Sequence, residues 1–202
     1  MKNKIKILLT VWLTILFAAI FLLFWHNEYK YSIPTPVPVN YHAVNMGKHI
    51  NLNGKLEETK NKPLFIHFFN PKCPCSRFNI PQIESLVKKY GDKISFAIVV
   101  VSDDSSYTEQ GIQDKFDLTI PILFDKSIAT SCGVFSTPQA VILDANHNLY
   151  YRGNYNKSRY CTDTKSNFAQ IALDSLLNNS QKPSFDSLAL TAYGCSLPNC
   201  KK

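Results

Sequence analysis

The residues most able to do chemistry in this chain are its six cysteines. Two of them, Cys73 and Cys75, flank a single proline in the segment NPKCPCSRF. Thiolates attack disulfides and also bind soft metal ions such as copper(I). The others are Cys132, Cys161, Cys195 and Cys200. We expect these four to be structural or resolving cysteines rather than attacking ones, and the sequence does not choose among their possible pairings.

The C-P-C motif lies where a predicted strand meets a predicted helix. An apolar run at 63–69 precedes it and a helical pattern follows. Cys73 is therefore expected at or near the helix N-cap, with Pro74 in the first turn, where its missing N–H is no loss. The helix dipole and free backbone N–H groups, with Lys72 and Arg77 nearby, favour the thiolate of Cys73. The thiolate is the species that attacks in disulfide exchange.

Strands and helices alternate along the part of the chain that must position this motif. Periodicity predicts strands at 63–69, 94–101, 120–124, 139–144 and 148–152, and helices at 76–90, 108–116, 127–132 and 167–177. A short hairpin is predicted over 49–56, with Asn53-Gly54 as its turn. This order predicts an α/β fold with a mixed β-sheet and helices on both faces.

A membrane anchor is predicted at the N-terminus. Residues 7–25 are uncharged and largely apolar, and as a helix they are about 28 Å long, enough to cross a bilayer. Lys2, Lys4 and Lys6 precede this run and place the N-terminus in the cytoplasm. A cleaved signal peptide is the alternative, but it would be shorter and would end in a small-x-small site, whereas this run ends in LLFW. We expect an uncleaved, single-pass transmembrane helix.

The formal charge of +7 reflects mainly this orientation signal. No basic stripe with interleaved aromatic residues is present, so no nucleic-acid partner is expected. The expected layout is a cytoplasmic N-terminus at 1–6, the anchor at 7–25, a proline-containing linker at 26–48, the α/β domain at 49–180 and a cysteine-containing tail at 181–202. The alternating prolines of the linker favour an extended spacer.

Two motifs together resemble a known family. FIHFFNPKCPCSRFNIPQIESL resembles the active-site strand and helix of the thioredoxin superfamily, nearest to its TlpA-like and redoxin branches. GVFSTPQAVILD, at 133–144, resembles the stretch that holds a cis-proline beside the active cysteine, and Thr137-Pro138 occupies that position. The resemblance implies a thioredoxin-like fold, thiol–disulfide exchange with protein thiols and disulfides as partners, and no cofactor or metal ion.

The motif departs from the family's usual C-x-x-C. With Cys73 aligned to the first cysteine, Ser76 takes the place of the second and Cys75 comes one position early. Two mechanisms therefore stay open. Either Cys75 resolves a mixed disulfide formed by Cys73, or a distant cysteine such as Cys132 or Cys195 does so.

A second departure is His67, which stands where thioredoxins often carry a buried carboxylate. It either transfers a proton to or from the cysteine pair or is a core histidine satisfied by hydrogen bonds. The predicted catalytic residues are Cys73 and Cys75, and the predicted supporting residues are His67, Ser76, Thr137 and Pro138.

The expected function is that of a membrane-anchored thiol–disulfide oxidoreductase in the inner (cytoplasmic) membrane, with its domain facing the periplasm or the cell exterior. One alternative is a thiol peroxidase, but Asn70 and Ile66 stand where that branch carries Thr or Ser and Pro. The other is a non-enzymatic copper-binding or copper-delivery protein, for which His147 on the predicted hairpin turn is the candidate histidine.

Overall fold

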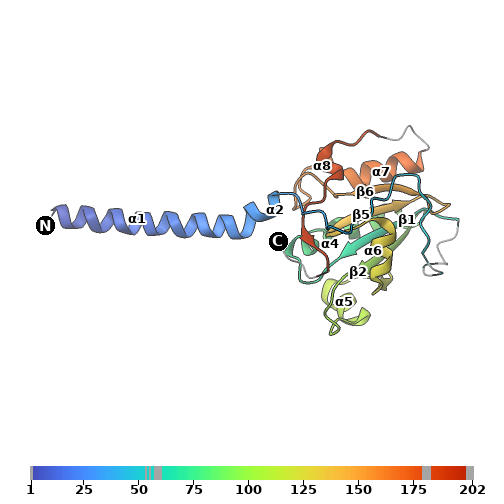
Figure 1. Cartoon of the computed structure of the whole chain (residues 1–202), viewed down its shortest axis with the longest axis horizontal. Helices are drawn as coiled ribbons and strands as arrows, with labels where there is room; N and C mark the ends of the chain where they lie inside the picture. The colour runs from blue at the N-terminus through green and yellow to red at the C-terminus, as the bar shows by residue number, and fades with distance from the viewer. Residues whose placement is uncertain (1, 53, 55, 57–60, 179–182, 199–202) are drawn as a thin grey trace. The chain divides into compact units, whose positions relative to one another are not determined.

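The structure, a computed structural model, forms two compact units, Met1–Ile33 and Pro34–Lys202 (Figure 1). It describes residues 2–52, 54, 56, 61–178 and 183–198. The first unit contains the helices α1 (Lys2–Phe24), η1 (Trp25–Tyr29) and α2 (Lys30–Ser32). Together they make one helical stretch that is long and apolar enough to cross a membrane. No side chain of α1 is buried, which is what a lipid-facing helix requires.

The second unit is built on a five-stranded sheet of order β3-β2-β1-β5-β6. Its strands are β1 (Leu64–Phe69), β2 (Ser95–Val100), β3 (Ile122–Leu123), β5 (Gln139–Leu143) and β6 (Leu149–Gly153). The central strand β1 pairs in parallel with β2 and antiparallel with β5. All six residues of β1 are buried, because both faces of the sheet are covered.

Helices cover the two faces of this sheet, as the sequence predicted. The helices are α3 (Pro74–Phe78), α4 (Ile80–Tyr90), α5 (Glu109–Phe116), α6 (Lys126–Cys132) and α7 (Phe168–Leu177), with a short 3-10 turn, η3, at Thr164–Ser166. On one face, α4 and α7 pack against the alternate strand residues that include Phe65 and Ile98. On the other, α6 packs with Leu64 and Val99. The fold is therefore a thioredoxin-like mixed sheet between two helical layers.

One local prediction came out differently, and another falls partly outside the described residues. The helix predicted at 76–90 is two helices, α3 and α4, which meet at Asn79. In the hairpin predicted at 49–56, Asn53 lies outside the described residues, and His49 bridges to Asn148 in the connection between β5 and β6. The N–H of Ile50 donates to the carbonyl of His147 in that same connection.

The C-terminal tail contains ordered elements that periodicity did not predict. These are the one-turn helix α8 (Ser187–Leu190) and the strand β7 (Cys195–Ser196). The strand β7 pairs antiparallel with β4 (Ser136–Thr137), forming a separate two-stranded sheet. Two-residue strands have no period of their own, so only the partner strand reveals them.

Candidate active site at the end of the central strand

Asn70, directly after β1, organises the loop that carries the first cysteine. Its side-chain amide donates to the carbonyl of Val101 at 2.8 Å, which joins the ends of β1 and β2. Its side-chain oxygen accepts the N–H of Lys72 at 2.9 Å, and its backbone oxygen accepts the N–H of Cys73 at 2.9 Å. The loop is thus a set of Asx-type turns that delivers Cys73 to the start of a helix. The Asn-Pro pair at 70–71 is a turn signal in the sequence, but these side-chain contacts with Val101 and Lys72 leave no local pattern.

Cys73 is the N-cap residue of α3, and Pro74 occupies the first helical turn, as predicted. Its thiol donates to the carbonyl oxygen of Thr137, with an S–O distance of 3.4 Å. The Thr137–Pro138 peptide bond is cis, which confirms the prediction made for it from the family resemblance. Two motifs 64 residues apart in the chain therefore meet at one point. Cys73 has no solvent-exposed surface in this arrangement.

Cys75 and Ser76 lie in the first turns of the same helix, and both are buried. The Ser76 hydroxyl accepts the N–H of Asn70 at 3.3 Å, so the residue aligned with the family's second cysteine is a structural contact of the loop. The carbonyl of Cys75 accepts a hydrogen bond from the Asn79 side chain at 2.9 Å. The same side chain accepts the thiol of Cys161 at 3.1 Å, which brings a further cysteine next to the motif helix.

Cys132 and Cys161 are unsuited to be the attacking thiol. Burial raises the pKa of each to about 12, so both are neutral thiols at pH 7. Cys132 lies in α6, in the core layer on the face of the sheet opposite α4. Its carbonyl accepts a hydrogen bond from Arg152.

His67 lies in the middle of β1, fully buried on the α4 face. Its Nδ1 is 2.7 Å from the hydroxyl of Tyr155, a residue that the sequence analysis did not single out. Among the described residues, Nε2 has no hydrogen-bond partner. Burial lowers the pKa of His67 to about 3, so the ring is neutral at pH 7. The ring therefore lies in the core beside Tyr155, and at neutral pH it is uncharged and carries a single N–H proton.

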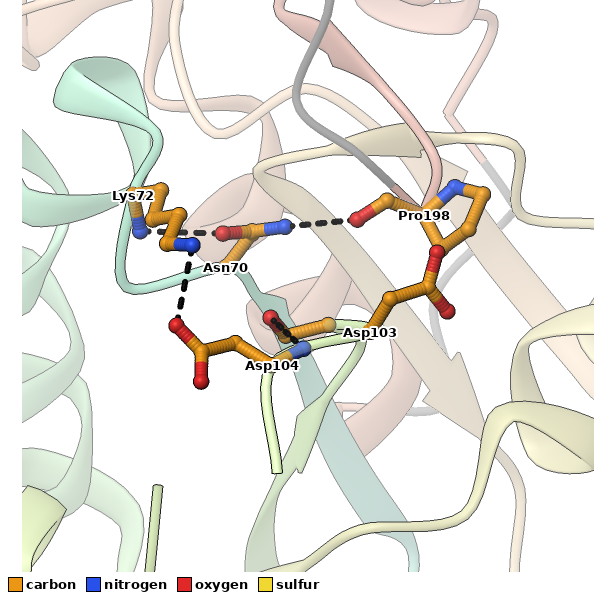
Figure 2. A pocket seen from close by; sticks show the side chains of 6 residues that line it. Asn70, Lys72, Asp103, Asp104 and Pro198 are labelled. Atoms are coloured by element: carbon orange, nitrogen blue, oxygen red, sulfur yellow. Dashed lines mark hydrogen bonds and ion pairs between the residues drawn. The ribbon is translucent and has the colours of Figure 1, made fainter. Parts of the chain in front are cut away.

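A small pocket of about 230 Å³ opens beside the cysteine loop and is lined by Asn70, Lys72, Ser102, Asp103, Asp104 and Pro198 (Figure 2). Lys72, which we expected to add positive charge near Cys73, forms an ion pair of 2.9 Å with Asp104. Hydrogen bonds from Ser106 and Lys72 hold the pKa of Asp104 well below its usual range. Lys72 therefore directs its charge to this carboxylate at the pocket.

The tail brings Cys195 to the same site. In the pairing of β4 with β7, Cys195 is the residue directly opposite Thr137. It is buried. The remaining cysteine of the tail, Cys200, lies outside the described residues.

The histidine considered for copper binding does not join the site. His147 lies in the turn between β5 and β6, beyond Leu143, which pairs with the first residue of β1. Cys73 follows the last residue of β1, so the length of that strand, about 20 Å, separates the two residues. Among the described residues, no three His, Cys, Asp or Glu side chains converge as a set able to hold a metal ion.

Sequence comparisons link this site to thiol–disulfide proteins. A family model described as "Domain of unknown function (DUF6436)" matches residues 42–198. Thioredoxin-like protein YneN of Bacillus subtilis is 34% identical over 92 residues, which are 44% of this chain and 54% of YneN. Thiol-disulfide oxidoreductase ResA of Halalkalibacterium halodurans is 25% identical over 92 residues, covering 45% of this chain and 52% of ResA. The chain thus spans about half the length of these relatives, and the predicted resemblance to thioredoxin-like proteins is confirmed.

Two solved structures share the fold over most of the chain. An uncharacterized conserved protein from Geobacillus kaustophilus superposes with a TM-score of 0.64 at 21% identity, covering 83% of this chain and 98% of its own. A hypothetical protein from Sinorhizobium meliloti gives a TM-score of 0.64 at 16% identity, covering 79% and 97%. At such identities the likeness concerns the fold alone.

Proposed function

The chain belongs to the family described as "Domain of unknown function (DUF6436)", and from that premise we propose that it is a membrane-anchored thiol–disulfide oxidoreductase that acts through Cys73. The observation that carries the proposal is the position of Cys73. It caps a helix that begins with proline, and its sulfur lies 3.4 Å from the carbonyl of Thr137. The names of the relatives YneN and ResA support the same chemistry.

In the proposed reaction the thiolate of Cys73 attacks one sulfur of a partner protein's disulfide. A mixed disulfide forms and the other partner sulfur leaves as a thiolate. A second thiol of the protein, that of Cys75 or of a distant cysteine, then attacks the sulfur of Cys73, which releases the second partner thiolate and leaves an oxidised enzyme. The same steps in reverse oxidise a partner dithiol. His67, Ser76, Thr137 and Pro138 support the site by holding the strand, the loop and the adjoining chain in place.

The proposed location is the inner membrane, with residues 1–6 in the cytoplasm, 7–25 across the bilayer and the α/β domain in the periplasm or at the cell exterior. The helical stretch Lys2–Ser32 and the lysines before the apolar run support this orientation. Within the exported part we propose a linker from 26 to 48, a domain from 49 to 180 and a tail to the C-terminus. Thr35 is nevertheless buried against the domain, so the spacer includes an ordered end.

The proposed function is tested with single cysteine variants of the full chain in detergent. In Cys73→Ser, the rate at which a model protein loses its disulfide bond should fall to the uncatalysed rate. The reason is that no other described thiol occupies the N-cap of α3. Cys75→Ser identifies the resolving thiol: partners that stay bound as mixed disulfides on a non-reducing gel indicate Cys75, and exchange without trapped partners indicates a distant cysteine. The matched control is Cys132→Ala, which removes a cysteine from the opposite face of the sheet and should keep exchange activity.

A Cys73→Ser protein that retains exchange activity would contradict the assignment. Peroxide consumption by the reduced wild-type protein is measured in parallel. Rapid consumption that depends on Cys73, without disulfide exchange, would make the protein a thiol peroxidase instead.

A further inference from the structure

The segment Gly194–Pro198 is held at the candidate active site by contacts on two sides. On one side, β7 pairs with β4, and the N–H of Leu197 extends that ladder by donating to the carbonyl of Phe135 at 3.0 Å. On the other side, the carbonyl of Pro198 accepts a hydrogen bond from the Asn70 side chain at 3.0 Å (Figure 2). The tail therefore runs from the strand that ends at Thr137 to the loop that starts at Asn70.

Cys73 lies between these two attachments. Its sulfur contacts the carbonyl of Thr137, and its N–H donates to the carbonyl of Asn70. The segment Gly194–Pro198 thus bonds to both of the chain segments that Cys73 contacts. The Cys73 side chain is completely buried.

The contact between tail and site is close-fitting. A Cβ atom at Gly194 would collide with the carbonyl oxygen of Thr137, the atom that also accepts the Cys73 thiol. The backbone of Gly194 has a φ of +139°, a value that residues other than glycine rarely adopt. The Thr35 hydroxyl links the tail to the β4 strand. It lies 3.1 Å from the carbonyl of Gly194 and 3.0 Å from the hydroxyl of Ser136.

The same pairing sets the position of the Cys195 thiol. Residues directly opposite one another in an antiparallel pair have Cα atoms about 4.5 to 5.5 Å apart. Cys195 is therefore one strand spacing from Thr137, whose carbonyl is in contact with the Cys73 sulfur. Of the two distant cysteines left open by the sequence, Cys195 lies at the site, whereas Cys132 packs in the core layer behind the sheet.

We propose that Cys195 is a redox residue of this site and resolves the mixed disulfide on Cys73, with the tail strand β7 as its carrier. The proposal rests on the proposed function, because it needs Cys73 to be the attacking thiol. A partner chain that reaches Cys73 must first displace β7, which frees the edge of β4. The return of β7 brings Cys195 back to Cys73 and closes that edge, so resolution and partner release are one event.

The step balances as an ordinary exchange. After Cys73 has attacked a partner disulfide, one partner sulfur is bonded to Cys73 and the other has left as a thiolate. The thiolate of Cys195 attacks the sulfur of Cys73, the bond to the partner breaks, and the partner leaves as a second thiolate that takes a proton from water. The partner disulfide gains two electrons, and the two enzyme thiols become the Cys73–Cys195 disulfide.

The test uses the reduced full chain in detergent, oxidised glutathione as the disulfide probe, and mass spectrometry of tryptic fragments. Trypsin releases 73–77 and 166–201, so Cys75→Ser leaves Cys73 as the one thiol of the first fragment. The second fragment contains Cys195 and Cys200. Cys200→Ser is the matched control, because it removes a cysteine from the same fragment.

We expect the two fragments to be linked in Cys75→Ser and in Cys75→Ser/Cys200→Ser. In Cys75→Ser/Cys195→Ser the link should be lost, and glutathione should stay on Cys73 at least about tenfold longer. A link that survives Cys195→Ser and disappears with Cys200→Ser overturns the proposal, and so does glutathionylated Cys73 that never forms a link. If Cys73 takes up no glutathione in any variant, the proposed function itself fails, which is a distinguishable result.

Discussion

His67 and Tyr155 form a buried polar pair inside an otherwise apolar layer of the core. Their side chains are joined at 2.7 Å, and burial raises the pKa of Tyr155 well above its usual value, so the phenol keeps its proton. The sequence left two roles for His67, a proton carrier or a core residue. The neutral ring and its tyrosine partner favour the core role at neutral pH.

We predict that His67 makes the folded protein less stable in acid. Its folded pKa of about 3 lies below the usual 6.5, so between these values the unfolded chain holds one more proton than the folded chain. The free energy of unfolding therefore falls as the pH drops from about 6.5 towards 3, by up to about 1.4 kcal/mol per pH unit from this residue. His67→Gln should flatten that part of the slope. Urea unfolding at several pH values measures it, and equal slopes for both proteins would refute the prediction.

Asn70 is the second residue on which the site depends. We predict that Asn70→Ala lowers the free energy of unfolding by about 2 to 3 kcal/mol, because the buried carbonyl of Val101 and the N–H of Lys72 lose their partner. Gln110→Ala is the control, since Gln110 is exposed and bonds only to exposed Asp114 among the contacts of its side chain that the structure describes. Urea unfolding compares the two, and a loss below about 0.5 kcal/mol for Asn70→Ala would contradict its role.

At the scale of elements, the strand β7 decides whether the site is open. A two-residue strand has little stability of its own, so its position depends on β4, on Thr35 and on Asn70. Local opening of such short elements is much easier than global unfolding. The tail is therefore the element of this site that we expect to move first.

We predict that Gly194→Ala speeds alkylation of Cys73 at least about tenfold, because the added Cβ would collide with the carbonyl of Thr137 and displace β7. The matched control is Gly47→Ala. Gly47 also has a positive φ, +85, but an added Cβ there meets nothing within 4 Å. Both substitutions place a side chain on a residue with positive φ, but only Gly194→Ala adds a steric clash with a neighbouring strand. Mass-resolved alkylation measures the rates, and equal rates in the two variants would show that β7 does not limit access to Cys73.

At the scale of the whole molecule, the chain joins a wholly exposed apolar helix to a domain with two buried core layers. An exposed apolar stretch of this length is costly in water and favourable in a bilayer. The lysines that precede it determine the proposed orientation. A thiol site on the oxidising side of the membrane could then meet exported proteins.

We predict that a reporter enzyme fused after Tyr31 is active only if the reporter works outside the cytoplasm. The control is the same fusion made after Met1, which should be active only with a reporter that works inside the cytoplasm. Membrane fractionation of the untagged chain accompanies the fusions, since an anchored protein stays with the membrane after a salt wash. A soluble mature form that begins near residue 26 would show that the helix is a cleaved signal instead.

The local pattern of the sequence predicted most of the domain. Buried apolar runs identified β1 and β2, and the proline after Cys73 identified the start of α3, because these signals lie within one element. The family resemblance added the meeting of Cys73 with Thr137. The division at Asn79 was missed, although Pro81 stands in the first turn of the second helix.

Tertiary structure alone decided which residues surround the cysteine. The sequence placed Cys195 in a tail without periodicity, and nothing local connects that tail to Thr137 or to Asn70. The connection is a two-residue ladder and one side-chain hydrogen bond, both between segments far apart in the chain. Hydrogen bonds of this kind depend on where the backbone of another segment lies, whereas helix and strand periodicity depends on near neighbours. The sequence by itself therefore predicted the cysteine that we propose to attack and the helix that it caps, and the folded chain decided which distant segments lie beside them.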